Sequence, residues 1–127
     1  MIWTKEIFID FDGPIHKYSE GYKDGSIYDV PTDNVKEVID ILKKRYSIVV
    51  FTARVSKMAA DELGKSIYDV KQDIERWLNK YSIYFDDITC EKRPAVAYID
   101  DLAIHFDTSG GWRTTLTNVL DFLRENG

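Results

Sequence analysis

Several features are scarce or missing in this sequence of 127 residues. It contains a single cysteine, Cys90, which excludes a disulfide within the chain. Only 7 Gly and 3 Pro occur, which argues against collagen and against a disordered linker. No apolar run approaches the roughly 20 residues that span a bilayer, and residues 1–10 lack the basic start and apolar stretch of a signal peptide. We therefore expect a cytoplasmic protein with no membrane partner and no disulfide partner.

Basic residues are also fewer than acidic ones: the chain has 17 basic and 22 acidic residues, for a net charge of −5. This balance disfavours broad, non-specific binding of nucleic acid, although it leaves room for a small basic patch. The hydrophobic fraction is 44% and includes 6 Phe, 8 Tyr and 3 Trp. These side chains are enough for one core, so we expect residues 1–127 to form a single domain.

The hydrophobic pattern alternates between strands and helices. Buried strands are predicted at residues 5–11, 46–52, 83–88 and 95–100. Amphipathic helices are predicted at residues 35–42, 70–81 and 116–123. Strands separated by helices pair in parallel through crossovers, which predicts a doubly wound α/β sandwich of three layers with a mainly parallel sheet.

Smaller features complete this picture. Thr32 or Asp33 is expected to cap the first helix, and Trp112 is expected to join the core at the start of the last one. Gly and Pro mark residues 13–32 as a loop, with a short hairpin between residues 15–18 and 26–30.

Acidic and hydroxyl side chains follow three of the predicted strands. Asp10 and Asp12 end the first strand, Thr52 ends the second, and Asp100 with Asp101 ends the last. Because the carboxyl ends of parallel strands share one edge of a sheet, these groups should meet in one crevice. Several carboxylates in one place repel one another, and Mg²⁺, which prefers oxygen ligands, relieves that repulsion. The alternative is that these residues only form turns and caps.

At this point the motifs resemble a known family. FIDFDG, FTAR, EKRP and YIDD occur in the order of the four motifs of the haloacid dehalogenase superfamily of phosphatases and phosphotransferases, over residues 5–106. The acidic first and last motifs are specific together, whereas the Thr and Lys motifs are weak alone. One departure is Pro14, since many members carry Thr after the Gly.

The resemblance implies a Mg²⁺-dependent phosphatase and a role for each matching residue. Asp10 would be the nucleophile that forms an aspartyl-phosphate, and Asp12 the general acid and base. Thr52 would bind the transferring phosphoryl group, and Lys92 would neutralise its charge, with Arg93 as an alternative. The implied metal ligands are Asp10, Asp12 through its backbone carbonyl, and Asp100 or Asp101.

The resemblance also bears on the substrate. Neither insertion point used by relatives is long enough here for a full cap domain, so the chain resembles the minimal, capless class. An open site suits a large phosphorylated substrate, such as a nucleic-acid or glycan end, and a nucleotide or sugar phosphate also fits. His16, Lys17 and Tyr18 of the loop, together with Arg54, are the predicted substrate contacts; the alternative is a solvated hairpin whose aromatics pack on its own base.

Two other functions are weighed against the phosphatase. A phospho-accepting receiver domain also combines acids, Thr and Lys, but its acidic pair lies at the first strand rather than after the Lys. A catalytically inactive domain that kept the fold would bind without turnover, yet every expected catalytic group is present. Neither the substrate nor the oligomeric state follows from the sequence.

Overall fold

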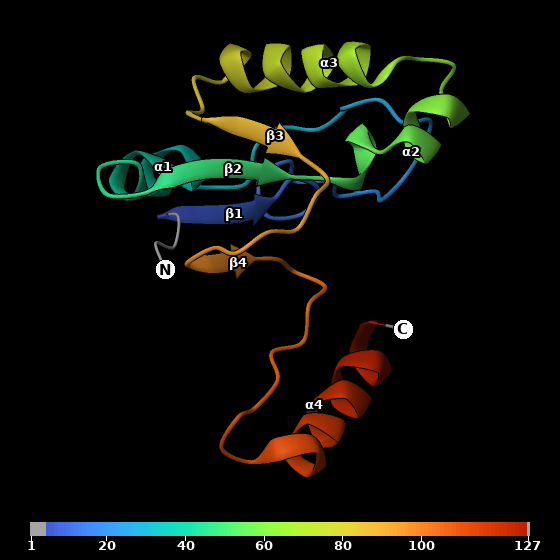
Figure 1. The fold of residues 1–127 in the computed structure, drawn as a ribbon. Helices are drawn as coiled ribbons and strands as arrows, with labels where there is room; N and C mark the ends of the chain where they lie inside the picture. Colours follow the sequence, from blue (N-terminus) through green and yellow to red (C-terminus); the bar gives the residue numbers. More distant parts are fainter. Residues whose placement is uncertain (1–4, 127) are drawn as a thin grey trace.

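The computed structural model describes residues 5–126, and a four-stranded parallel sheet lies at its centre (Figure 1). The strands are β1 (Glu6–Asp10), β2 (Ser47–Phe51), β3 (Asp87–Thr89) and β4 (Ala97–Ile99). Their spatial order is β3-β2-β1-β4, and every neighbouring pair is parallel. This confirms the predicted α/β class and its parallel sheet, which is compatible with a Rossmann-like sandwich.

Helices connect the strands. α1 (Val35–Leu42) lies between β1 and β2, whereas α2 (Lys57–Glu62) and α3 (Ile67–Lys80) lie between β2 and β3. The short 3₁₀ helix η1 (Ala53–Val55) precedes α2, and α4 (Gly111–Asn126) follows β4. α2 was not predicted, because only one of its residues is buried and six residues carry no readable apolar stripe.

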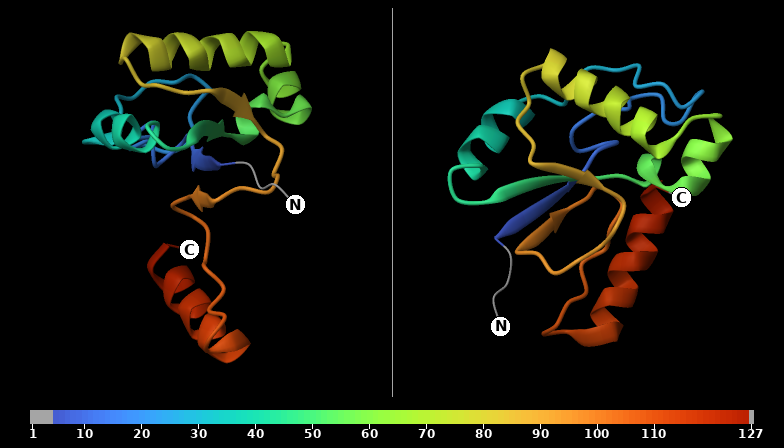
Figure 2. Two further views of the ribbon diagram at one scale, coloured as in Figure 1. Left: turned by 60° about the vertical axis from the view of Figure 1, so that its left-hand side comes forward. Right: turned by 45° about the horizontal axis from the view of Figure 1, so that its top comes forward.

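The main core lies on the face of the sheet that α1 and α3 cover (Figure 2). Successive strand residues point to opposite faces, so Ile7 and Ile9 of β1 share this face with Ile48 and Val50 of β2. The helices supply the buried side chains that pack against these four residues: Ile39, Val70, Ile74, Trp77 and Leu78. Both helices lie on one face because their crossovers run in the same direction along the sheet and share one hand.

The opposite face is covered by chain rather than by a helix among residues 5–126. Phe8 of β1 and Val49 of β2 point to this face and are fully buried. The segment 90–96, which joins β3 to β4, lies over it. The Arg93 guanidinium stacks 5.1 Å from the Phe8 ring centroid and bonds the Glu6 carboxylate at 2.8 and 3.0 Å.

α4 stands apart from the sheet in both figures. Its predicted apolar stripe exists, but Leu116, Leu120 and Leu123 are exposed rather than packed against strands. The expectation that Trp112 belongs to the core is wrong, since its side chain is 74% exposed and contacts Phe106 at 5.0 Å between ring centroids. No helix in the described part of the chain is long and apolar enough to cross a membrane.

Two local predictions need correction. The first helix is capped neither by Thr32 nor by Asp33: its N-cap is Asn34, and the Thr32 hydroxyl donates to the Pro14 carbonyl at 2.6 Å instead. The short strand predicted at residues 83–88 begins only at Asp87. Just before β3, the side chain of Asp86 replaces a backbone acceptor of the ladder, because its carboxylate accepts the Ile48 N–H at 2.7 Å.

The core assignment makes a direct prediction about stability. We expect Ile74→Ala to lower the free energy of unfolding by about 2–5 kcal/mol, because it leaves a cavity at a fully buried position. Ile41→Ala removes the same atoms from a side chain that is 64% exposed and should cost less than about 0.5 kcal/mol. Urea denaturation of both variants tests this, and equal losses would contradict the assigned core.

Candidate functional site

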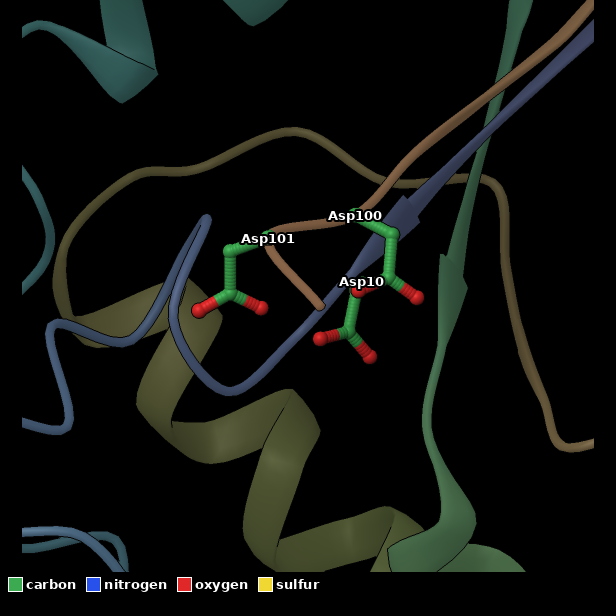
Figure 3. A group of neighbouring side chains, drawn as sticks. All are labelled: Asp10, Asp100 and Asp101. Carbon is green, nitrogen blue, oxygen red and sulfur yellow. The ribbon is translucent and has the colours of Figure 1, made fainter. Parts of the chain in front are cut away.

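Three carboxylates converge where β1 and β4 end. Ile9 pairs with Ile99 in the parallel ladder, so the residues that follow, Asp10 at the end of β1 and Asp100 just after β4, lie side by side. Asp10, Asp100 and Asp101 each offer a carboxylate oxygen, and these oxygens lie within 4.8 Å of one another (Figure 3). The structure therefore brings together three of the four predicted metal ligands through their side chains.

The environment of Asp10 disfavours its ionised form. Burial is the largest cause, followed by repulsion from Asp100, Asp101 and Asp12, and together they raise the pKa of Asp10 from 3.8 to about 7. A divalent cation would offset the repulsion and so favour the ionised form of Asp10. Three carboxylates, two of them exposed and open to water, form an oxygen-rich donor set that fits Mg²⁺.

The backbone conformation and surroundings of Gly13 explain why the first acidic motif ends in glycine. Its φ is +106°, a backbone conformation that residues with a side chain rarely adopt. A Cβ atom at this position would lie 2.3 Å from a carboxylate oxygen of Asp101. Glycine therefore lets the loop after β1 pass close to the acid that follows β4.

Asp12 occupies a different environment from Asp10. Arg54 donates two hydrogen bonds to the Asp12 carboxylate, from Nε to Oδ2 at 2.7 Å and from Nη2 to Oδ1 at 3.0 Å. The His16 ring bonds the same Oδ1 at 2.8 Å. Burial alone would raise the pKa of Asp12, but the hydrogen bonds from His16 and Arg54 outweigh it and lower that pKa. Two neighbouring acids of one motif are thus shifted in opposite directions, a pattern that favours different chemical roles.

His16 does not occupy the place predicted for it. The ring is fully buried, and Nε2 accepts the Asp29 backbone N–H at 3.0 Å. Because Nε2 is an acceptor, a neutral His16 carries its proton on Nδ1 and donates it to Asp12. The predicted contact between His16 and substrate is therefore not supported, because the buried ring bonds Asp12 and the Asp29 backbone and does not line the cavity.

The loop 13–32 forms the short hairpin that its sequence indicates. Lys17 N–H donates to the Val30 carbonyl, and Thr32 N–H donates to the Ile15 carbonyl, both at 2.9 Å. Residues 18–29, which we call the flap, extend beyond these two bonds. Lys17 is exposed at the base of the flap, whereas Tyr18 is half-buried beside the site.

Arg54 connects the flap to the acidic site. While Nε and Nη2 hold Asp12, Nη1 donates to the carbonyl of Gly25 in the flap at 2.7 Å. Its guanidinium carbon also lies 5.9 Å from the ring centroid of Tyr18. Sequence spacing gave no sign of the contact with Asp12, because 42 residues separate the two partners.

Of the candidates Thr52, Lys92 and Arg93, only Thr52 lines the cavity beside the acids. Thr52 is buried at the end of β2, and its oxygen accepts the Arg54 N–H at 3.1 Å as the cap of η1. Lys92 is exposed, its ammonium lies 5.3 Å from the Tyr98 ring centroid, and it forms no ion pair with the described residues. Arg93, its alternative, is occupied by Glu6.

A cavity of about 270 Å³ opens beside Asp10, Asp12 and Thr52. Its remaining wall comes from the flap and from α2 with the turn after it, including Tyr18, Tyr22, Ala59, Glu62 and Leu63. Of the lining residues from Ala53 to Leu63, only Arg54 was among the predicted site residues. No motif marks them, since they reach the site only through the way α2 folds back.

The raised pKa of Asp10 predicts how stability depends on pH in metal-free protein. The folded protein retains a proton on Asp10 up to about pH 7, whereas the unfolded chain releases it near 3.8, so stability falls as pH rises between these values. Asp10→Asn removes the carboxylate and with it the loss of stability that its ionisation causes. Allowing for partial solvent screening, we expect it to gain about 1–2 kcal/mol at about pH 9 relative to about pH 5.

Thermal unfolding in EDTA at both pH values measures this difference, with Asp33→Asn as a surface control. Adding Mg²⁺ should stabilise the wild type more than Asp10→Asn, because only the wild type keeps all three carboxylates. If Asp10→Asn exceeds the wild type in stability by the same amount at both pH values, the raised pKa of Asp10 would be contradicted.

Comparison with known proteins adds no relative. No family model matches the chain, and no curated protein or solved structure is significantly similar to it.

Proposed function

We propose that this chain is a Mg²⁺-dependent phosphomonoester hydrolase of the minimal, capless haloacid dehalogenase type. The observation that carries the proposal is the meeting of Asp10, Asp100 and Asp101 at the carboxyl ends of adjacent parallel strands, beside Thr52 and a cavity. Parallel α/β sheets place their ligands at this edge.

Asp10, Asp100 and Asp101 would hold the cation through their carboxylates, and the resemblance adds the backbone carbonyl of Asp12. When bound, Mg²⁺ offsets the negative charge that gathers when an anionic nucleophile meets an anionic phosphoryl group. With the cation bound, the repulsion that raises the pKa of Asp10 would be offset. Asp10 would then be ionised at neutral pH and a competent nucleophile.

In the first step an Asp10 carboxylate oxygen forms a bond to phosphorus, and the bond from phosphorus to the leaving oxygen breaks. Asp12 donates its proton to that oxygen, so the leaving group departs as an alcohol. In the second step Asp12 takes a proton from water, the water oxygen attacks phosphorus, and the bond to Asp10 breaks. Phosphate leaves, and both acids return to their starting forms.

Asp12 must carry a proton before the first step, yet Arg54 holds it as a carboxylate in the substrate-free protein. An arriving phosphate dianion competes for the Arg54 guanidinium, whose rigid fork can bind two phosphate oxygens at once. As Arg54 turns towards the substrate, Asp12 loses its strongest cation and becomes easier to protonate. His16 keeps one hydrogen bond on Asp12 throughout and holds its orientation.

Thr52 and Lys92 complete the proposed machinery. The Thr52 oxygen accepts a hydrogen bond, which leaves its proton available for a phosphoryl oxygen. Lys92 is exposed and without an ion pair in the described part of the chain, but its ammonium lies over Tyr98 and outside the cavity lining, so it would have to turn towards the site to neutralise the phosphoryl group.

A competing proposal is a binding domain without turnover. The observation in its favour is the ion pair that ties Asp12 to Arg54 and to the flap. If that pair never opens, phosphorylated ligands would bind and remain intact.

The two steps can be separated with 4-nitrophenyl phosphate, whose leaving group needs no proton. We expect Asp10→Asn to lose turnover by at least about a thousandfold, because no covalent bond to phosphorus can form. Asp12→Asn should instead release about one nitrophenolate per chain and then stall as a phosphoprotein, because no base activates water. Stopped-flow absorbance and intact mass measure the burst and the added phosphoryl group.

Asp33→Asn serves as the matched control and should behave as the wild type. Metal-dependent turnover that survives in Asp10→Asn would remove Asp10 as nucleophile. Tight phosphate binding without turnover in the wild type would favour the binding domain.

A further inference from the structure

The cavity beside Asp10 has a composition that suits one kind of leaving group. Tyr18 and Tyr22 of the flap face it from one side, and Ala59 and Leu63 line it from the other. Resting on the phosphatase function proposed above, we propose that this cavity binds the leaving group of the substrate, and that this group is a single flat ring system carrying a hydrogen-bond donor. The substrate is then a small aryl-like or nucleoside-like phosphomonoester.

The flap wall is held in place by specific contacts. Tyr18 has a φ of 56°, which is unusual for a bulky residue, and its ring lies 5.5 Å from His16 and 6.1 Å from Tyr28 between centroids. An uncommon backbone conformation at a cavity is retained when the surrounding contacts fix it, and such residues gather at binding sites.

The tip of the flap is also seated on the turn after α2. Gly25 has a φ of +86°, and a Cβ atom there would lie 2.5 Å from a methyl group of Leu63. Its carbonyl is bound by Arg54. The flap therefore rests on both the acidic site and α2, and it covers one side of the cavity instead of leaving the site open.

The lining is mainly apolar, with polar groups that have no partner in the described part of the chain. These are the hydroxyls of Tyr18 and Tyr22 and the carboxylate of Glu62. Aromatic and aliphatic walls favour the faces of a ring. Glu62 favours a ring with an amino or hydroxyl donor and disfavours a second anionic group.

The size of the cavity separates small substrates from polymers. A volume of about 270 Å³ is at the lower end of ligand pockets, which accommodates one ring system and little more. The sequence alone favoured a large substrate, because the chain is too short for a cap. The seated flap narrows the site, which favours a small phosphomonoester over the end of a nucleic acid or glycan.

Phosphonates that cannot be hydrolysed test this proposal independently of turnover. We expect benzylphosphonate to bind the Mg²⁺-loaded protein about tenfold more tightly than ethylphosphonate, as one stacked ring contributes. In Tyr22→Ala this ratio should fall to about one, and in Tyr22→Phe it should persist because the ring is retained. Tyr22 is 65% exposed, so its replacement does not endanger the fold.

Tyr68→Ala is the matched control, since Tyr68 is exposed on α3 and lies outside the cavity lining. It should keep the wild-type ratio. Glu62→Gln should reduce the preference for 4-aminobenzylphosphonate over benzylphosphonate. Isothermal titration calorimetry gives each ratio.

The outcomes separate this proposal from the function on which it rests. Ring preference that depends on Tyr22 but comes without turnover would retain the ring site and reject the phosphatase. Turnover with equal affinity for both phosphonates, or with Tyr22→Ala unchanged, would overturn the ring site alone. A 5′-phosphorylated oligonucleotide that is hydrolysed as efficiently as a nucleoside monophosphate would also overturn it. Failure of both phosphonates to bind would reject both proposals.

Discussion

The parallel pairing of β1 with β4 is the constraint on which the rest of the site depends. It forces the acids that follow these strands into one small volume, and the folded chain must accept their mutual repulsion. Burial and that repulsion raise the pKa of Asp10 to about 7, so the metal-free protein holds a proton where a nucleophile is needed. A bound cation resolves both problems at once, since it offsets the repulsion and leaves Asp10 ionised. The proposed chemistry is thus a consequence of strand order.

A second network gives the neighbouring acid a different role. Asp12 lies two residues from Asp10, yet Arg54 and His16 stabilise its anion. Arg54 also binds the Gly25 carbonyl, so a single side chain links the proposed general acid to the flap. Movement of Arg54 towards an incoming phosphate would loosen its hold on Asp12. In the proposed mechanism, substrate entry and proton supply would therefore be coupled through one guanidinium group.

Much of this architecture follows from local sequence patterns. Apolar runs that end in Asp10, Thr52 and Asp100 predict parallel strands, and their common direction predicts the shared edge. The prediction that all three strands are buried is wrong for β4, an edge strand whose Ile99 is 43% exposed. What the sequence did not reveal depends on distant contacts. The pairing of Arg54 with Asp12, the seating of Gly25 on Leu63 and the burial of His16 involve residues that no short motif relates. The stripe on α4 shows the converse limit, because periodicity predicts an amphipathic helix but not what its apolar face contacts.

The central claim is that Asp10 receives the phosphoryl group beside a cation held by Asp10, Asp100 and Asp101. A crystal structure of the protein with Mn²⁺ and beryllium fluoride, a mimic of the aspartyl-phosphate, tests it most directly. We expect anomalous density among these three carboxylates and a beryllium adduct on an Asp10 oxygen. Manganese bound elsewhere, or an adduct on a different residue, would contradict it.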